Sequence, residues 1–333
     1  MAKGGKHRKA CGLICAFAAS AMFASFAASA QVPVPSAQPA EAPPEQQFIK
    51  PATIDDSLEV TGDSVAAKQI NTRMLIGVEV NGKGPFGFFV DSGADRTVIG
   101  EALAQRLALP LGPPVMLNSM SGAKLTPTVR ISSLRVGSSV VHDISAPPLP
   151  ERFLAAQGLL GIDALADQRL DIDFEHKRIT VQDTHGPELS AGPGEVVVVA
   201  RRRKGQLILT QAIAAGSPVA AVIDTGTEIT VGNSALRAKL LRKGRLTFRT
   251  ASLMSVTGES LIADLIVVPE IRIGSILFKG ATIAFVDVPP FKLFGLEKQP
   301  ALMLGTDILE GFNRVSLDFR RRRVRFSLRP GSR

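Results

Sequence analysis

The chain has 333 residues, which is enough for two modest domains with hydrophobic cores of their own. Its formal charge of +9 is a mild excess that does not by itself indicate nucleic-acid binding. Aromatic residues are scarce, and Trp and Tyr are both absent, which disfavours the aromatic platforms on which single-stranded nucleic acids stack. We therefore expect no nucleic-acid partner.

Residues 1–30 have the features of a secretory signal peptide. A basic start is followed by an apolar run and by Ala28-Ser29-Ala30, a small-residue cleavage site. The apolar run is short and rich in alanine, which favours cleavage over the alternative, an uncleaved N-terminal anchor. No later stretch is long and apolar enough to span a membrane. We expect a protein secreted across the inner membrane into the periplasm, with no transmembrane span after signal removal.

The rest of the chain divides into a leader and two similar halves. Residues 31–67 are rich in Pro and Ala and predict a linker or pro-segment without a core. Short strand-like patterns with turn signals then fill residues 68–185 and 195–330, and little of either half has helical periodicity. This pattern predicts an all-β fold with two homologous β-barrel-like lobes in tandem.

Each half contains an apolar strand that runs into an acidic turn. The first turn is Asp91-Ser92-Gly93-Ala94-Asp95 and the second is Asp224-Thr225-Gly226-Thr227-Glu228. Further matches follow, among them Ser121-Gly122 with Thr257-Gly258, and Leu160-Gly161 with Leu304-Gly305. The offset between matching positions rises slowly from 133 at the aspartates to 144 at the last glycines. Such a drift indicates a tandem duplication with small loop insertions.

The paired aspartates point to acid–base chemistry. Gly93 and Gly226 allow either a positive φ or a close backbone approach at the turn, and the hydroxyls of Ser92 and Thr225 are placed to hydrogen-bond between the two turns. Two carboxyl groups in a desolvated site share a proton and titrate as a pair. One then takes a proton from water while the other donates a proton to a carbonyl oxygen.

The two acidic turns resemble those of retropepsin-like aspartic proteases, arranged as two lobes in one chain as in the pepsins. The Asp-Ser-Gly-Ala-Asp and Asp-Thr-Gly-Thr motifs carry the likeness, together with the apolar-apolar-Gly stretches that end at Gly161 and Gly305. The likeness covers residues 68–328. The signal peptide and tandem lobes are also similar to the two-lobed aspartyl proteases of the bacterial periplasm. The chain lacks the pepsin flap Tyr and pepsin disulfides, and its lobes are shorter.

This resemblance implies an aspartic endopeptidase without cofactor or metal, a monomer with lobes related by a pseudo-two-fold, and an active-site cleft between them. Asp91 and Asp224 would be the catalytic pair, and protein or peptide the substrate. Two flap hairpins would turn at Gly122 and Gly258. The remaining residues that the resemblance places against substrate are Ala94, Asp95, Ser121, Thr227 and Thr257.

Other interpretations remain open at this point. A catalytically inactive, peptide-binding relative would use the same cleft, and a two-carboxylate glycosidase would use the same acids, although scarce aromatic residues disfavour sugar stacking. The motifs HExxH and GxSxG are absent, and both cysteines (Cys11 and Cys15) lie in the signal peptide.

Several other polar residues have local interpretations. Asp95 and Glu228 either touch the substrate backbone or are solvated acids at a helix start. We expect Thr97 and Thr230 to bond local backbone, and Asp163 and Asp307 to cap short helices. The basic runs at residues 201–204 and 320–325 are expected to be solvated, with contact to an anionic surface or an acidic partner as the alternative.

Overall fold

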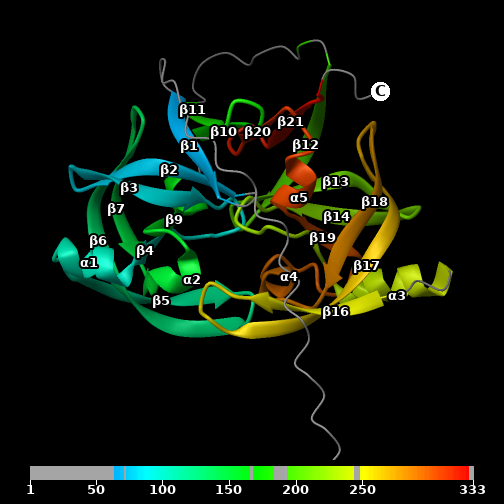
Figure 1. Cartoon of the computed structure of the whole chain (residues 1–333), viewed down its shortest axis with the longest axis horizontal. Helices are drawn as coiled ribbons and strands as arrows, with labels where there is room; N and C mark the ends of the chain where they lie inside the picture. The colour runs from blue at the N-terminus through cyan, green and yellow to red at the C-terminus, as the bar shows by residue number, and fades with distance from the viewer. Residues whose placement is uncertain are drawn as a thin grey trace, which may run out of the picture. The chain divides into compact units, whose positions relative to one another are not determined.

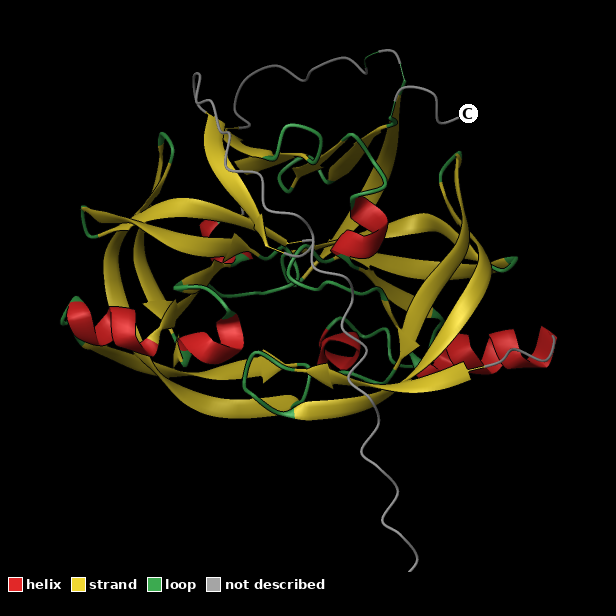
Figure 2. Ribbon diagram, viewed as in Figure 1, coloured by secondary structure: helices red, strands yellow, loops and turns green. Residues whose placement is uncertain are grey.

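The computed structural model describes residues 64–70, 73–165, 168–183, 192, 194–243 and 248–329, all within one compact unit. The expected signal peptide and most of the expected linker lie outside these residues. Strands dominate and helices are short, as Figure 2 shows, so the all-β prediction is confirmed. Among the described residues, no helix combines the length and the hydropathy needed to cross a membrane.

The first half runs from β1 to β11. Its strands are β1 (Ser64–Ile70), β2 (Arg73–Val80), β3 (Lys83–Val90), β4 (Val98–Gly100), β5 (Leu111–Ser119), β6 (Gly122–Val136), β7 (Ser139–Ala146), β8 (Pro148–Leu149), β9 (Gly158–Leu160), β10 (Gln168–Asp173) and β11 (Arg178–Asp183). Its helices are α1 (Glu101–Arg106), α2 (Glu151–Leu154) and the 3-10 helix η1 (Ile162–Ala164). Because β1 begins at Ser64, residues 64–67 are strand and not part of the expected 31–67 linker.

The second half runs from β12 to β21. Its strands are β12 (Glu195–Arg203), β13 (Gln206–Ala214), β14 (Ser217–Ile223), β15 (Val231–Gly232), β16 (Phe248–Met254), β17 (Ser260–Ile273), β18 (Ile276–Phe285), β19 (Ala301–Leu304), β20 (Arg314–Asp318) and β21 (Arg323–Ser327). Its helices are α3 (Ser234–Lys243), α4 (Pro289–Leu293) and α5 (Thr306–Leu309).

The two halves repeat one pattern of strand pairing. In the first, β3 pairs in parallel with β9, and β9 pairs antiparallel with β4. In the second, β14 pairs in parallel with β19, and β19 pairs antiparallel with β15. β3 and β14 are buried at their C-terminal ends, where Val90 and Ile223 precede the two aspartates. Each aspartate therefore leaves the end of a buried central strand, a position that backbone pairing on both sides holds fixed.

A six-stranded antiparallel sheet joins the halves, in the order β1, β11, β10, β20, β21, β12. The central pair places Leu170 opposite Leu317 and Ile172 opposite Val315, and all four side chains are buried in the main core. Figure 1 shows the sheet where blue β1 and green β10 and β11 of the first half meet red β20 and β21 of the second. The halves therefore share one hydrophobic core through this sheet.

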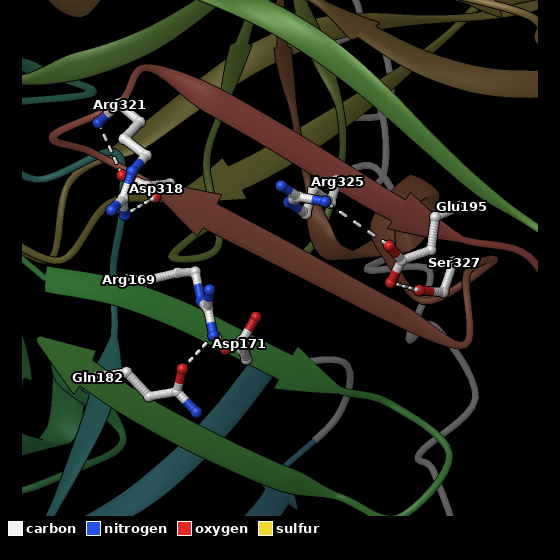
Figure 3. A network of polar contacts seen from close by, with 8 residues as sticks. All are labelled: Arg169, Asp171, Gln182, Glu195, Asp318, Arg321, Arg325 and Ser327. Atoms are coloured by element: carbon white, nitrogen blue, oxygen red, sulfur yellow. Dashed lines mark hydrogen bonds and ion pairs between the residues drawn. The ribbon is translucent and has the colours of Figure 1, made fainter. Parts of the chain in front are cut away.

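Side chains of the joining sheet form ion pairs and hydrogen bonds with one another (Figure 3). The Arg169 Nε donates to Asp171 Oδ2 at 3.0 Å, and its terminal nitrogen donates to Gln182. Arg321 bonds Asp318 at 3.1 Å and Arg325 lies 3.8 Å from Glu195. The expectation that residues 320–325 form a solvated basic face is therefore wrong for Arg321 and Arg325. The residues of the run 201–204 are exposed, as expected.

Candidate active site

The two aspartate loops are anchored in the same way. We call residues 91–95 the Asp91 loop and residues 224–228 the Asp224 loop. The Asp91 N–H donates to the Leu160 carbonyl and the Asp224 N–H to the Leu304 carbonyl, both at 3.0 Å. The carbonyls of Ala94 and Thr227 accept from the N–H groups of Ile162 and Thr306, at 3.0 Å and 2.9 Å. The apolar-apolar-Gly stretches therefore support the loops from behind, as the sequence pattern predicted.

Ser92 and Thr225 link the two loops by crossed hydrogen bonds. The Ser92 N–H donates to Thr225 Oγ1 at 2.9 Å, and the Thr225 N–H donates to Ser92 Oγ at 3.1 Å. Each hydroxyl then donates to the strand of the other half, Ser92 to the Ile223 carbonyl at 3.0 Å and Thr225 to the Val90 carbonyl at 2.8 Å. All of these groups are buried, so both hydroxyls have their donor and acceptor roles filled. The predicted contact between these hydroxyls and the opposite turn is confirmed.

The Asp91 and Asp224 carboxyl groups lie close together, because each is packed against the glycine of the opposite loop and the charge of Asp91 acts on Asp224. Asp91 Oδ1 accepts from the N–H groups of Gly93 and Ala94, both at 2.9 Å. Asp224 Oδ1 accepts from the Gly226 N–H at 3.0 Å. We expected Ala94 and Thr227 to touch substrate. In the structure, the Ala94 N–H donates to Asp91 and the Thr227 carbonyl accepts from the Thr306 hydroxyl, so both backbone groups stabilise the aspartate loops.

Burial sets the acidity of both groups. Desolvation raises the pKa of Asp91 above its ordinary value, against the lowering effects of the Ala94 and Gly93 N–H groups and of the Arg73 charge. Desolvation also raises the pKa of Asp224, and the negative charge of Asp91 raises it further, so that it lies well above its ordinary value. The pair therefore binds a proton more tightly than two exposed aspartates would.

The glycines of the two loops provide space for the opposite carboxyl group. A Cβ built on Gly93 would collide with the Asp224 carboxyl group, and one on Gly226 would collide with that of Asp91. Neither glycine has a positive φ, so close approach explains their presence and the alternative of a left-handed turn is wrong.

Two threonine–aspartate pairs that sequence reasoning misread lie behind the loops. The Asp163 carboxylate accepts from the Thr97 hydroxyl at 2.7 Å and from its N–H at 2.8 Å. Asp307 accepts from the Thr230 hydroxyl at 2.8 Å and from its N–H at 3.0 Å. The two hydroxyls in turn accept from Gly161 N–H and Gly305 N–H.

The two threonine–aspartate pairs link positions that lie 66 and 77 residues apart in the sequence. The prediction that Asp163 and Asp307 are the N-caps of their helices is wrong, because the N-cap positions are Gly161 and Gly305. Asp307 Oδ1 does accept from the Ile308 N–H in the first turn of α5, at 2.8 Å. Thr97 and Thr230 bond distant carboxylates and glycines, and not the local backbone that we expected.

Two hairpins, β5–β6 and β16–β17, meet at their tips (Figure 1). Ser121 Oγ lies 3.0 Å from Thr257 Oγ1 and 3.4 Å from Ser255 Oγ. Met120 packs against a cluster of the second half that includes Phe291, whereas Val256 packs against a cluster of the first half that includes Leu154. Each tip therefore contacts the opposite half. The predicted tip residues Gly122 and Gly258 differ in backbone conformation and in surroundings. Only Gly258 has a positive φ, of 86°, and only Gly258 lies against the ring of Phe153.

Asp95 and Glu228 occupy matching loop positions in different surroundings. Glu228 Oε1 lies 3.2 Å from the Nε of Arg73, which belongs to the other half. Asp95 is half-buried, and desolvation raises the pKa of its carboxyl group, against the lowering effect of Arg96. Sequence reasoning missed Arg73 and its counterpart Gln206, although each precedes its half's aspartate by the same number of residues.

Comparison with protein families identifies both halves. A family model described as "gag-polyprotein putative aspartyl protease" matches residues 76–167, and one described as "Aspartyl protease" matches residues 210–308. The chain belongs to the retropepsin-like aspartyl proteases. The first match contains Asp91 and Gly161 and the second contains Asp224 and Gly305. The aspartyl protease family is thus represented twice in tandem, with one aspartate loop in each copy. A search of curated proteins found no match.

The aspartyl protease family implies a peptidase that acts on peptide bonds. Within the described part of the chain, no group of three or more His, Cys, Asp or Glu side chains is arranged to hold a metal ion.

Proposed function

We propose that this aspartyl protease is an active endopeptidase in which Asp91 and Asp224 together activate the water that attacks the peptide bond. The observation that carries the proposal is the close approach of the two carboxyl groups, each packed against the glycine of the opposite loop, in loops that Ser92 and Thr225 link. Like charges held this close cannot both ionise easily, so the pair retains one proton. One carboxylate and one carboxylic acid are what a base and an acid acting in the same step require.

The chemistry needs no covalent enzyme intermediate. The ionised carboxylate takes a proton from water as the water oxygen bonds to the carbonyl carbon. The carbonyl π electrons move to the carbonyl oxygen, which takes the proton from the other carboxyl group. The crossed hydrogen bonds of Ser92 and Thr225 support this proposal, because they hold both loops in one geometry without consuming either carboxyl group.

The hairpin tips fit the role of flaps over a bound peptide. We propose that β5–β6 and β16–β17 open to admit substrate and close over it, with Ser121, Gly122, Thr257 and Gly258 at the contact. Their hydroxyl contacts at 3.0 Å are replaceable by water or by peptide groups, so opening leaves no buried polar group without a partner. Asp95, whose half-buried carboxyl group belongs to the Asp91 loop, is proposed to contact the substrate backbone.

The test of catalysis replaces each aspartate separately. Asp91→Asn and Asp224→Asn are each expected to abolish cleavage of an unfolded protein, because the one carboxyl group that remains cannot act as base and acid in the same step. Asp143→Asn is the matched control, since Asp143 is exposed and its φ of 58° suits asparagine as well as aspartate. Wild-type cleavage by either active-site variant would exclude the pair. A wild-type protein that binds but never cleaves peptides would indicate the inactive relative.

Two further proposals concern the state of the protein in the cell. We propose that the chain is exported to the periplasm with residues 1–30 removed, which N-terminal sequencing of the exported protein tests. We also propose that a monomer with pseudo-two-fold lobes is the active unit, because one chain supplies both aspartates. Activity per mole that rises with concentration, together with sedimentation as a dimer, would contradict the second proposal.

A further inference from the structure

The turn between β12 and β13 is strongly basic and lies beside the Asp91 loop. Four exposed cations, which we call the basic turn, are found there: Arg201, Arg202, Arg203 and Lys204. Arg203 pairs with Gln206 across the turn, and the Gln206 amide nitrogen donates to the Gly93 carbonyl at 2.8 Å. Gly93 in turn lies against the Asp224 carboxyl group. The basic turn is therefore connected to the aspartate pair through two direct contacts.

The basic turn also reaches the segment that supports the β5–β6 hairpin. The Arg203 guanidinium lies against Gly295, and its Nη1 is 3.5 Å from the Gly295 carbonyl oxygen. Gly295 lies between Phe294 and Leu296, and both of these side chains belong to the cluster against which Met120 of the hairpin tip packs. Arg203 therefore extends from the neighbourhood of the Asp91 loop to the support of a hairpin tip. These are the two parts between which the proposed function places the peptide.

The first half has the same turn without these charges. Arg203 occupies the last paired position before the β12–β13 turn, and Ile70 occupies the matching position before the turn between β1 and β2. The next residue in the sequence is Lys204 in the second half and Asn71 in the first. Two positive charges of the second half are thus replaced by uncharged residues in the first.

Other cations near the two turns do not cancel this difference. Arg73 follows the turn of the first half, but its Nε lies 3.2 Å from the carboxylate of Glu228, which neutralises its charge. The short helices near the two hairpin tips have one exposed cation each, Arg152 on α2 and Lys292 on α4. The helices therefore contribute equally, and the difference between the halves lies in the turns.

The cations of the basic turn outnumber the acids around them. Within the described part of the chain, none of the four cations forms an ion pair. Asp95 is two residues from Gly93 and already experiences the positive charge of Arg96. Glu297 is two residues from Gly295 and is exposed. The basic turn therefore has charge available for an acidic group of another molecule.

We propose that the basic turn makes the enzyme prefer substrates with acidic side chains at one end of the bound peptide, the end beside Arg203 and Lys204. This inference rests on the proposed function, to which it adds a substrate class. Arginine binds a carboxylate through two parallel N–H groups, and lysine adds a compact charge. No such preference is expected at the other end, where Ile70 and Asn71 take the matching positions. The duplicated halves then treat the two ends of a substrate differently.

A general attraction between a basic protein and acidic peptides predicts a different outcome. The neighbouring β20–β21 turn also has exposed cations, Arg320 and Arg322, and the Ala200 N–H donates to the Arg322 carbonyl at 2.9 Å. Arg203→Gln with Lys204→Asn removes two charges from one turn, and Arg320→Gln with Arg322→Asn removes two from the other. Asparagine suits the positive φ of Lys204 and of Arg322, which are 52° and 55°. The second double variant is therefore a matched control.

The experiment measures kcat/KM for peptides in which a single Glu is moved along an otherwise neutral sequence. In the wild type, we expect Glu to raise kcat/KM about two- to five-fold on one side of the scissile bond only, which is the effect of one exposed ion pair. Arg203→Gln with Lys204→Asn should remove this gain, and the control variant should keep it. Equal gains on both sides, no gain on either, or equal losses in the two variants would overturn the proposal.

A binding measurement separates this proposal from the proposed function. Fluorescence anisotropy compares a labelled Glu-containing peptide with a neutral one on Asp91→Asn protein, which avoids cleavage. Tighter binding of the acidic peptide, lost in high salt and on addition of Arg203→Gln with Lys204→Asn, supports the proposal. Equal binding of the two peptides overturns it. If the wild type cleaves nothing, the proposed function fails, whereas this measurement still decides the role of the basic turn.

Discussion

Gly93 of the first half lies directly against the Asp224 carboxyl group of the second, with no room for a Cβ atom between them. Gly226 lies in the same way against Asp91. The distance between the two aspartates is therefore limited by the glycine of the opposite loop. The contact has a direct mutational consequence.

Gly93→Ala and Gly226→Ala are each expected to force the carboxyl groups apart and to lower the free energy of unfolding by about 1–3 kcal/mol through overpacking. Cleavage should fall more than stability, since the sharing of one proton by the two carboxyl groups depends on this spacing. Urea unfolding and peptide cleavage measure the two effects. Wild-type stability and activity in both variants would show that the loops have more room than the structure indicates.

The two hairpin-tip glycines should respond unequally to the same change. Gly258→Ala is expected to destabilise the β16–β17 tip, because Gly258 has a φ of 86° and a Cβ there would collide with Phe153. Gly122→Ala is the matched control, since no atom lies within 4 Å of its Cβ position and its φ is not positive. Hydrogen exchange of the two tips is the measurement. Equal exchange in both variants would contradict the asymmetry.

Protonation of Asp224 should couple stability to pH. Its pKa lies well above the ordinary value of 3.8 in the folded protein, because of burial and the Asp91 charge. The folded state therefore binds the proton more tightly, and the stabilisation is present at low pH and is lost as pH rises from about 3.8 through the raised pKa.

Asp224→Asn removes this dependence. Relative to wild type, the variant is expected to gain stability as pH rises toward neutrality. Urea unfolding at a series of pH values from 3 to 8 provides the comparison, with Asp143→Asn as the exposed control. A stability difference that stays constant across this range would contradict the raised pKa.

Loss of the Thr230 hydroxyl should lower the free energy of unfolding more than loss of an exposed threonine hydroxyl does. Thr230→Val removes the donor to Asp307 and leaves the buried Gly305 N–H without its acceptor. Each buried group left without a partner costs about 1–3 kcal/mol. The matched control is Thr126→Val, because the Thr126 hydroxyl makes only an exposed bond to the Lys124 carbonyl. Equal unfolding free energies for the two variants would contradict the role of Thr230.

The sequence predicted the features that recur in both halves. The Asp91 and Asp224 turns and the stretches ending at Gly161 and Gly305 all follow from local patterns found twice, and duplication makes a weak local signal much stronger. The meeting of Ser92 and Thr225 also followed, because turns at matching positions of two lobes were expected to pack together.

Local patterns failed where a residue's partner is distant. Asp163 has the sequence position of a helix cap, but its partner Thr97 lies 66 residues earlier. Residues 64–67 belong to β1 because their backbone pairs with residues near Arg178 and Ile76, which their own composition does not reveal. Arg73 and Glu228 meet only because the halves pack together, so neither half's pattern shows the contact.

The crossed hydrogen bonds between the aspartate loops join residues 133 and 135 positions apart, and β21, near the end of the described chain, completes the joining sheet. Contacts of such long range form late in folding, after most of the chain is available. A growing chain thus contains one aspartate, or two without their supporting strands. The order of synthesis itself withholds the assembled pair until β21 has been made.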